Sequence, residues 1–169
     1  MNITKAILPI FLTAILLQNP SLSGQTIPKF EIKDQYGQTY SSQNIKSRPV
    51  VLLGCHLHDL EVCRKIGRKI YWKMQNLLWK DASKVEFLMY LDLRETNQMV
   101  ESYIEESKNK QFESILLDRQ GQLSTGLKKQ EGYLRIFGKS GIEIHSEYLE
   151  KISDENIQKI HNILRGEIK

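Results

Sequence analysis

An unbroken apolar run near the first third of the chain constrains the fold more than any other feature. Val50–Gly54 directly follows Pro49 and contains no polar side chain. A strand that is buried on both faces has this pattern, and such strands are typical of parallel sheets covered by helices. Val85–Leu91 and Ser114–Leu117 have a similar character further along the chain. The sequence therefore predicts a sheet with parallel strands.

Helical patterns separate these predicted strands. Apolar residues recur at helical spacing from about Asp59 to Lys80, where they form a stripe roughly 100° wide that is typical of a core-facing helix. A second helical pattern covers Asn97–Lys108, and Ser153 is the expected N-cap of a final helix. Two antiparallel hairpins are also expected, at 30–33 with 39–40 and at 133–137 with 142–148. Strands that alternate with helices predict an α/β fold with right-handed crossovers.

This order of elements, together with four short motifs, resembles the thioredoxin-like superfamily. Within it, the chain is most similar to secreted thioredoxin-like and peroxiredoxin-like proteins over roughly residues 30–164. The motifs are Phe30-x3-Asp34-x2-Gly37-Gln38, Pro49–Leu53 leading into a cysteine-bearing loop, Leu116-Leu117-Asp118-x2-Gly121, and Gly138–Gly141. The resemblance implies a thioredoxin-like fold with a mixed central sheet flanked by helices and an N-terminal β-hairpin.

The first residues have the layout of a secretory signal peptide. A short basic start precedes the apolar run Ala6–Leu17, and the small residues Ser21 and Ser23 follow it. Twelve apolar residues are too few for a stable membrane span, which needs about 20. We therefore expect residues 1–23 to be removed and residues 24–169 to form one thioredoxin-like domain. Such a protein is exported, periplasmic or secreted, and disulfides persist in those compartments.

The catalytic residues of the superfamily are matched only in part. Thioredoxin-type oxidoreductases carry Cys-x-x-Cys at the start of the first long helix, where the helix dipole lowers the pKa of the first thiol. At the equivalent positions Cys63 takes the second place and Leu60 replaces the nucleophile. In an alignment with the peroxiredoxin pattern, Cys63 takes the position of the peroxidatic cysteine, but Leu60 stands where that pattern has Thr or Ser. Gly132 stands at the position of the family's cis-proline, and Arg135 is out of register with the peroxidase arginine.

The two cysteines are the candidates for catalysis. Cys55 ends the first core strand and Cys63 lies in the first turns of the next helix, at the sheet edge where α/β proteins gather their sites. Four interpretations are open: a structural disulfide, two unpaired cysteines, a redox pair in which Cys55 attacks and Cys63 resolves, and a metal site completed by His56 or His58. Charged residues within Asp92–Glu95, at the same edge, are interpreted as loop charges and helix-capping acids.

One side of the predicted long helix is basic and aromatic. Its five cations occur without an acidic residue among them: Arg64, Lys65, Arg68, Lys69 and Lys73. Trp72 and Trp79 are expected to project from the side opposite the apolar stripe. Two interpretations are open. This side contacts an acidic partner or lipid head groups, or it is a solvated face whose tryptophans are covered by the N-terminal hairpin.

Composition narrows the function classes. The chain has 24 basic and 20 acidic residues and a net charge of +4, and the two signs are interleaved, so no nucleic-acid binding is predicted. No Gly-rich phosphate loop or other cofactor motif is present, and no cofactor is expected.

The favoured hypothesis is an exported thiol-disulfide or peroxide-linked redox protein that uses Cys55 and Cys63 on a protein thiol or disulfide partner. The alternative is a non-catalytic binding or structural protein of the cell envelope, with copper or other metal binding as a third hypothesis. The sequence does not assign an oligomeric state.

Overall fold

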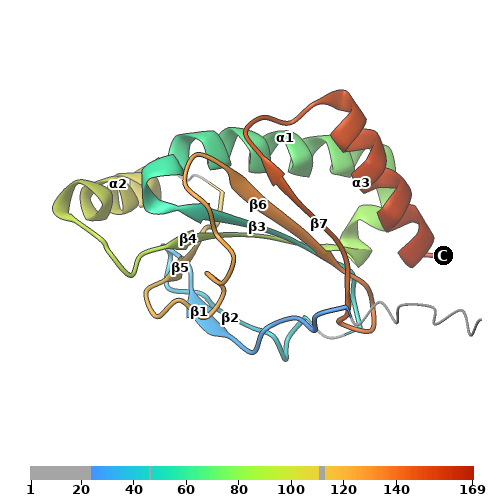
Figure 1. Cartoon of the computed structure of the whole chain (residues 1–169), viewed down its shortest axis with the longest axis horizontal. Helices are drawn as coiled ribbons and strands as arrows, with labels where there is room; N and C mark the ends of the chain where they lie inside the picture. The colour runs from blue at the N-terminus through green and yellow to red at the C-terminus, as the bar shows by residue number, and fades with distance from the viewer. Residues whose placement is uncertain (1–23, 46, 111–112) are drawn as a thin grey trace, which may run out of the picture.

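The computed structural model describes residues 24–45, 47–110 and 113–169 (Figure 1). Two short 3₁₀ segments, Leu57–Asp59 and Trp79–Lys84, flank the longest helix. The strands are β1 (Glu31–Lys33), β2 (Thr39–Ser41), β3 (Val50–His56), β4 (Glu86–Asp92), β5 (Leu116–Asp118), β6 (Gly132–Phe137) and β7 (Glu143–Leu149), and the helices are α1 (Leu60–Leu78), α2 (Gln98–Asn109) and α3 (Asp154–Glu167).

The central sheet has five strands in the order β5-β4-β3-β6-β7 (Figure 1). β3 and β4 are parallel, as are β4 and β5, whereas β6 runs antiparallel to β3 and β7 antiparallel to β6. All residues of the central strand β3 except His56 are buried, as its apolar sequence predicted. β1 and β2 form a separate antiparallel hairpin. The predicted mixed sheet with an N-terminal hairpin is therefore confirmed.

The two faces of the sheet are covered by different elements. Alternate residues of β3 point to opposite faces, so Leu53 packs with the helices while Leu52 packs with the N-terminal hairpin. The helix-side core includes Cys55 and Cys63. Figure 1 shows α1 and α3 on the upper side of the sheet and the hairpin on the lower side.

This arrangement corrects one interpretation of the sequence. The N-terminal hairpin lies on the sheet face opposite α1, so it does not cover the tryptophans of that helix. Trp72 is 57% exposed and Trp79 is 75% exposed. The sequence pattern located the outward side of α1 correctly, but the face on which the hairpin would pack cannot be read from local spacing.

The bounds of the helices differ slightly from those predicted. α1 ends at Leu78 rather than Lys80, because Trp79 has a backbone φ of 50° and cannot continue a right-handed helix. Asp59 precedes α1, but its side chain makes no capping hydrogen bond. Ser153 caps α3 as predicted, in a capping box with Asn156.

The predicted signal peptide, residues 1–23, lies outside the described residues. Along the described parts of the chain, no helix combines the length and the apolar character that crossing a membrane requires. The first described residues are joined to the sheet edge, because Glu143 N–H donates to the Gln25 carbonyl at 2.7 Å and Ile27 N–H donates to the Gly141 carbonyl at 2.8 Å. The folded unit therefore includes the chain from about residue 25 onward.

Candidate functional site

The two cysteines form a disulfide that joins β3 to α1. Cys55 is the last but one residue of β3, and Cys63 is the fourth residue of α1. Their Cα atoms are 6.0 Å apart, within the usual range for a disulfide. Of the four interpretations of the sequence, the one with two unpaired cysteines is therefore wrong. In this oxidised form the sulfurs are bonded to each other, so neither is a free thiolate for a metal.

The disulfide is shielded from solvent. Cys55 and Cys63 are each only 1% exposed. They belong to the helix-side core together with Leu57, which begins the 3₁₀ segment that crosses from β3 to α1 and is itself buried. An external thiol can therefore reach either sulfur only when some part of the structure around the bridge moves.

Three polar residues meet at the carboxyl ends of the parallel strands. His56 of β3 pairs in register with Asp92 of β4, which in turn pairs with Asp118 of β5. Asp92 is 5% exposed and accepts hydrogen bonds from the Arg94 guanidinium, Nε to Oδ1 at 3.0 Å and Nη2 to Oδ2 at 2.7 Å. Burial alone would raise the pKa of the Asp92 carboxyl. The hydrogen bonds from Arg94, together with the charges of Arg94 and of the nearby His56, outweigh burial and lower this pKa.

This ion pair corrects the interpretation of Asp92 as a helix-capping acid. The N-cap of α2 is Asn97, whose side chain accepts a hydrogen bond from the Val100 N–H. Asp92 is instead the buried partner of Arg94. The sequence contained a sign of this pairing. An acidic residue at the end of a buried strand needs a cation or hydrogen-bond donors when it is desolvated.

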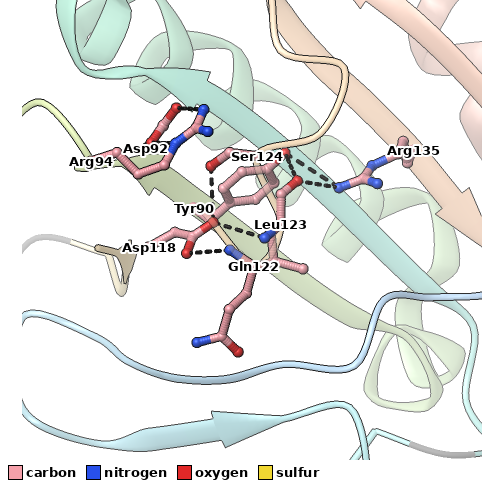
Figure 2. Close-up of polar contacts among 8 residues, drawn as sticks. All are labelled: Tyr90, Asp92, Arg94, Asp118, Gln122, Leu123, Ser124 and Arg135. Carbon is pink, nitrogen blue, oxygen red and sulfur yellow. Dashed lines mark hydrogen bonds and ion pairs between the residues drawn. The ribbon is translucent and has the colours of Figure 1, made fainter. Parts of the chain in front are cut away.

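Asp118 fixes the loop after β5, as Figure 2 shows. Its side chain is completely buried and accepts hydrogen bonds from the backbone N–H groups of Gln122 and Leu123, both at 2.8 Å. The Ser124 hydroxyl donates a third at 2.9 Å. A buried carboxylate with three donors satisfies its hydrogen-bonding requirement without a cation. The motif that carried the family resemblance thus has a structural role here.

Arg135 lies on the sheet face opposite the disulfide. It pairs in register with Leu52, which packs on the hairpin side, and its guanidinium donates to the Leu123 carbonyl at 3.0 Å (Figure 2). The Tyr90 hydroxyl donates to the same carbonyl at 2.7 Å. Burial raises the pKa of Tyr90 far above its ordinary value. Arg135 therefore tethers the loop after β5 and does not contact the cysteines.

A second contact joins the loop before β6 to the start of α1. The Gln130 N–H donates to the Asp59 carboxylate at 2.7 Å. This bond explains why the Asp59 side chain does not cap α1. Gln130 adopts a left-handed backbone conformation, with φ 69°. The segment between β3 and α1 is therefore held by the loop that leads into Gly132, the position at which the resemblance places the cis-proline.

The histidines near the disulfide stack on each other. The His56 and His58 rings have centroids 5.2 Å apart and an interplanar angle of 22°. Among the residues that the structure describes, none is a hydrogen-bond partner of the buried His56 Nδ1. In the described parts of the chain, no group of three or more His, Cys, Asp or Glu residues is arranged to hold a metal ion.

Comparisons with known proteins agree with this architecture. No family model matches the sequence, and no curated protein matches it either. Among solved structures, the thiol:disulfide interchange protein DsbE of Chlorobium tepidum has a TM-score of 0.61 at 11% identity, covering 87% of this chain and 98% of its own. The thioredoxin domain of a thiol-disulfide oxidoreductase from Bacteroides vulgatus has a TM-score of 0.58 at 12% identity, covering 84% and 97%. The exposed lipoprotein thioredoxin of Streptococcus pneumoniae has a TM-score of 0.55 at 16% identity, covering 80% and 99%.

The fold of this chain is therefore thioredoxin-like, as the sequence resemblance predicted. The site that accompanies it is a buried disulfide whose cysteines have a sequence separation of 8.

Proposed function

We propose that this chain is a thiol-disulfide redox protein whose reactive group is the Cys55–Cys63 disulfide. The observation that carries the proposal is the position of the bridge. It joins the carboxyl end of the central parallel strand to the first turns of the following helix, where α/β folds gather their sites. Structures with the same fold include proteins described as thiol-disulfide oxidoreductases and interchange proteins, which supports the proposal.

The proposed reaction is exchange with a dithiol of a partner protein. A partner thiolate attacks Cys55 Sγ, the Cys55–Cys63 bond breaks, and Cys63 leaves as a thiolate. The positive end of the α1 helix dipole favours this negative charge. The second partner thiolate then attacks the partner sulfur of the mixed disulfide and releases Cys55. The partner dithiol loses two electrons and two protons to become a disulfide, and this chain gains them as two thiols.

Access to the sulfurs is the main requirement of this reaction. Each cysteine is 1% exposed, so exchange requires a local opening around the bridge, and the short Leu57–Asp59 segment between β3 and α1 is the proposed place. Attack at Cys55 fits the assignment from the sequence, in which Cys55 attacks in the reduced protein and Cys63 resolves. A peroxide-linked reaction has less support, because Arg135 lies on the opposite face of the sheet.

The burial of the disulfide favours a second candidate function. A bridge that solvent does not reach is typical of a structural disulfide, which suits a non-catalytic binding or structural protein with the same fold. The reduction potential separates the two functions. We expect a potential above about −300 mV if the bridge exchanges with thiols, whereas a structural bridge has a more negative one.

Single-cysteine variants test which sulfur reacts. Cys63→Ser leaves Cys55 free, and this variant is expected to attack oxidised glutathione, form a mixed disulfide that mass spectrometry detects and release one reduced glutathione. Cys55→Ser is the matched control and should react much more slowly. If neither folded variant forms a mixed disulfide and the potential lies below about −300 mV, the structural function is favoured.

We also propose that the protein is exported, after cleavage behind Ser23. The signal-peptide pattern of residues 1–23 supports this, as does the similarity in fold to the Streptococcus pneumoniae thioredoxin, which is described as an exposed lipoprotein. The mature chain would begin at Gly24, next to the residues that are joined to β7. Mass spectrometry of the protein from fractionated cells tests the cleavage, and a chain that retains Met1 in the cytosol contradicts it.

A further inference from the structure

The outward face of α1 is rich in cations, and the helix has no acidic residue of its own after Glu61. From Val62 to Lys80 the sequence contains six cationic residues and no Asp or Glu. A shallow groove of about 370 Å³ runs along this part of the helix, and its lining combines cations with an indole: Lys65, Arg68, Lys69, Trp72, Lys73 and Asn76. We call these six residues the α1 basic groove.

Aromatic side chains lie on and next to the α1 basic groove. Trp72 is 57% exposed, and the Tyr71 ring packs against its edge with centroids 5.4 Å apart. Trp79 directly follows the helix and is 75% exposed. Its backbone has a φ of 50°, a left-handed conformation that is costly for a bulky residue. The chain has only two tryptophans, and both present large apolar rings to solvent here.

Some cations of this region are already paired and others are not. The Arg68 guanidinium donates two hydrogen bonds to the Glu113 carboxylate, at 2.7 and 2.8 Å. Lys69 donates to the Ile152 carbonyl at 3.0 Å. Within the described residues, the exposed Lys65 and Lys73 have no ion pair or hydrogen bond. Their charges are therefore available to an external anion.

We propose that the α1 basic groove docks on an anionic lipid bilayer. Lysines beside exposed tryptophans match an interfacial surface, because the indole rests at head-group depth while the ammonium groups meet lipid phosphates. An acidic protein partner fits less well, since protein interfaces are depleted in lysine and enriched in arginine. Here the unpaired cations are lysines, and Arg68 is already held by Glu113. This inference goes beyond the proposed redox function and does not depend on it.

Vesicle binding by the full chain tests the proposal. The probe is a vesicle of about one-third phosphatidylglycerol and two-thirds phosphatidylcholine, compared with pure phosphatidylcholine. We expect sedimentation with the anionic vesicles only, together with a blue shift of the tryptophan emission. High salt should release the protein, because the Debye length falls to about 3 Å at 1 M.

Charge-matched variants locate the binding surface. Lys65→Gln with Lys73→Gln should weaken partitioning about 25-fold, taking about fivefold for each lysine near an anionic surface. The control removes the same charge elsewhere, by Lys33→Gln with Lys139→Gln on the hairpin and on the β6–β7 turn. Trp72→Ser should weaken binding and reduce the blue shift while Lys65 and Lys73 remain. The apolar run Ala6–Leu17 is present in every sample, so it does not contribute to these differences.

Several results would overturn the proposal. Equal binding to neutral and anionic vesicles would show that another apolar segment is responsible. Equal losses in the two charge-matched pairs would show that net charge alone drives binding. No binding to either vesicle would exclude the bilayer, and an acidic protein would then become the better-supported partner.

Discussion

Reduction of the Cys55–Cys63 bridge should destabilise the folded chain by about 2.5 kcal/mol. The bridge closes a loop with a sequence separation of 8 residues. A crosslink over this length removes about 8 cal/mol/K of entropy from the unfolded chain, which corresponds to about 2.5 kcal/mol at 25 °C. We expect the reduced cysteines to stay in the folded core, so the loss should come mainly from the unfolded state.

Urea unfolding with and without a phosphine reductant measures this loss. The double variant Cys55→Ala with Cys63→Ala is the control, because its stability should not respond to the reductant. The same free energy also enters the redox equilibrium. By linkage, the disulfide of the folded chain should have a potential about 50 mV more negative than that of the unfolded chain.

Agreement between these two measurements is the critical result. If reduction changes the free energy of unfolding by less than about 0.5 kcal/mol, the loop-closure reasoning is wrong. A folded potential equal to that of the unfolded chain would contradict it independently. A loss much larger than the expected value would show that reduction disrupts the native packing around α1.

Three further predictions concern the core and the ion pairs. Gly54→Ala should cost about 3 kcal/mol in urea unfolding, because the added Cβ would lie 2.2 Å from the Tyr90 ring, and an equally stable variant would contradict this packing. Asp118→Ala should also cost about 3 kcal/mol, because two buried donors and one partly buried donor lose their acceptor, whereas a loss below about 1 kcal/mol would refute that role. The Arg119 hydrogen bonds lower the pKa of Glu101 from 4.5 to about 2. Because the pKa of Glu101 is lower in the folded chain than in the unfolded chain, its ionised carboxylate stabilises the fold above about pH 4.5. This contribution is lost as the pH falls through about 2. Since the Arg119–Glu101 pair is partly exposed, the free energy of unfolding of the native chain should exceed that of Glu101→Gln by about 1 kcal/mol or less at neutral pH. This difference should vanish near pH 2.

The regular elements could be predicted because their patterns are local. The apolar run of β3, the helical spacing of α1 and the cap at Ser153 each specify one element from neighbouring residues. The bounds of α1 were less predictable. Nothing in the sequence near Trp79 indicates a left-handed backbone, since glycine and asparagine are the residues that favour it.

The polar part of the site was harder to predict, because it depends on pairing across strands. Asp92 is the last residue of β4 and Asp118 is the last residue of β5. They come into register only through the strand order β5-β4-β3. Arg135 carries no local sign that it faces away from the cysteines. Its side follows from the register with Leu52, which the order of elements alone does not give.

The placement of the cysteines was predicted better than their chemistry. Their positions at a strand end and in a first helical turn follow from the pattern of elements, and the disulfide was one of the interpretations left open. Cys63 lies on the predicted core-facing stripe of the helix, so its burial followed from the pattern, whereas the burial of Cys55 was not predicted.

The hydrogen bond between Asp59 and Gln130 links the segment between β3 and α1 to the loop before β6. If the segment between β3 and α1 moves to admit a partner thiol, this bond must break, and the Gln130 amide becomes accessible to water. Hydrogen exchange at that single amide therefore reports on motions that uncover the disulfide, without any label on the cysteines. If the bridge reacts only after this separation, its rate of exchange with thiols cannot exceed the opening rate that this amide reports.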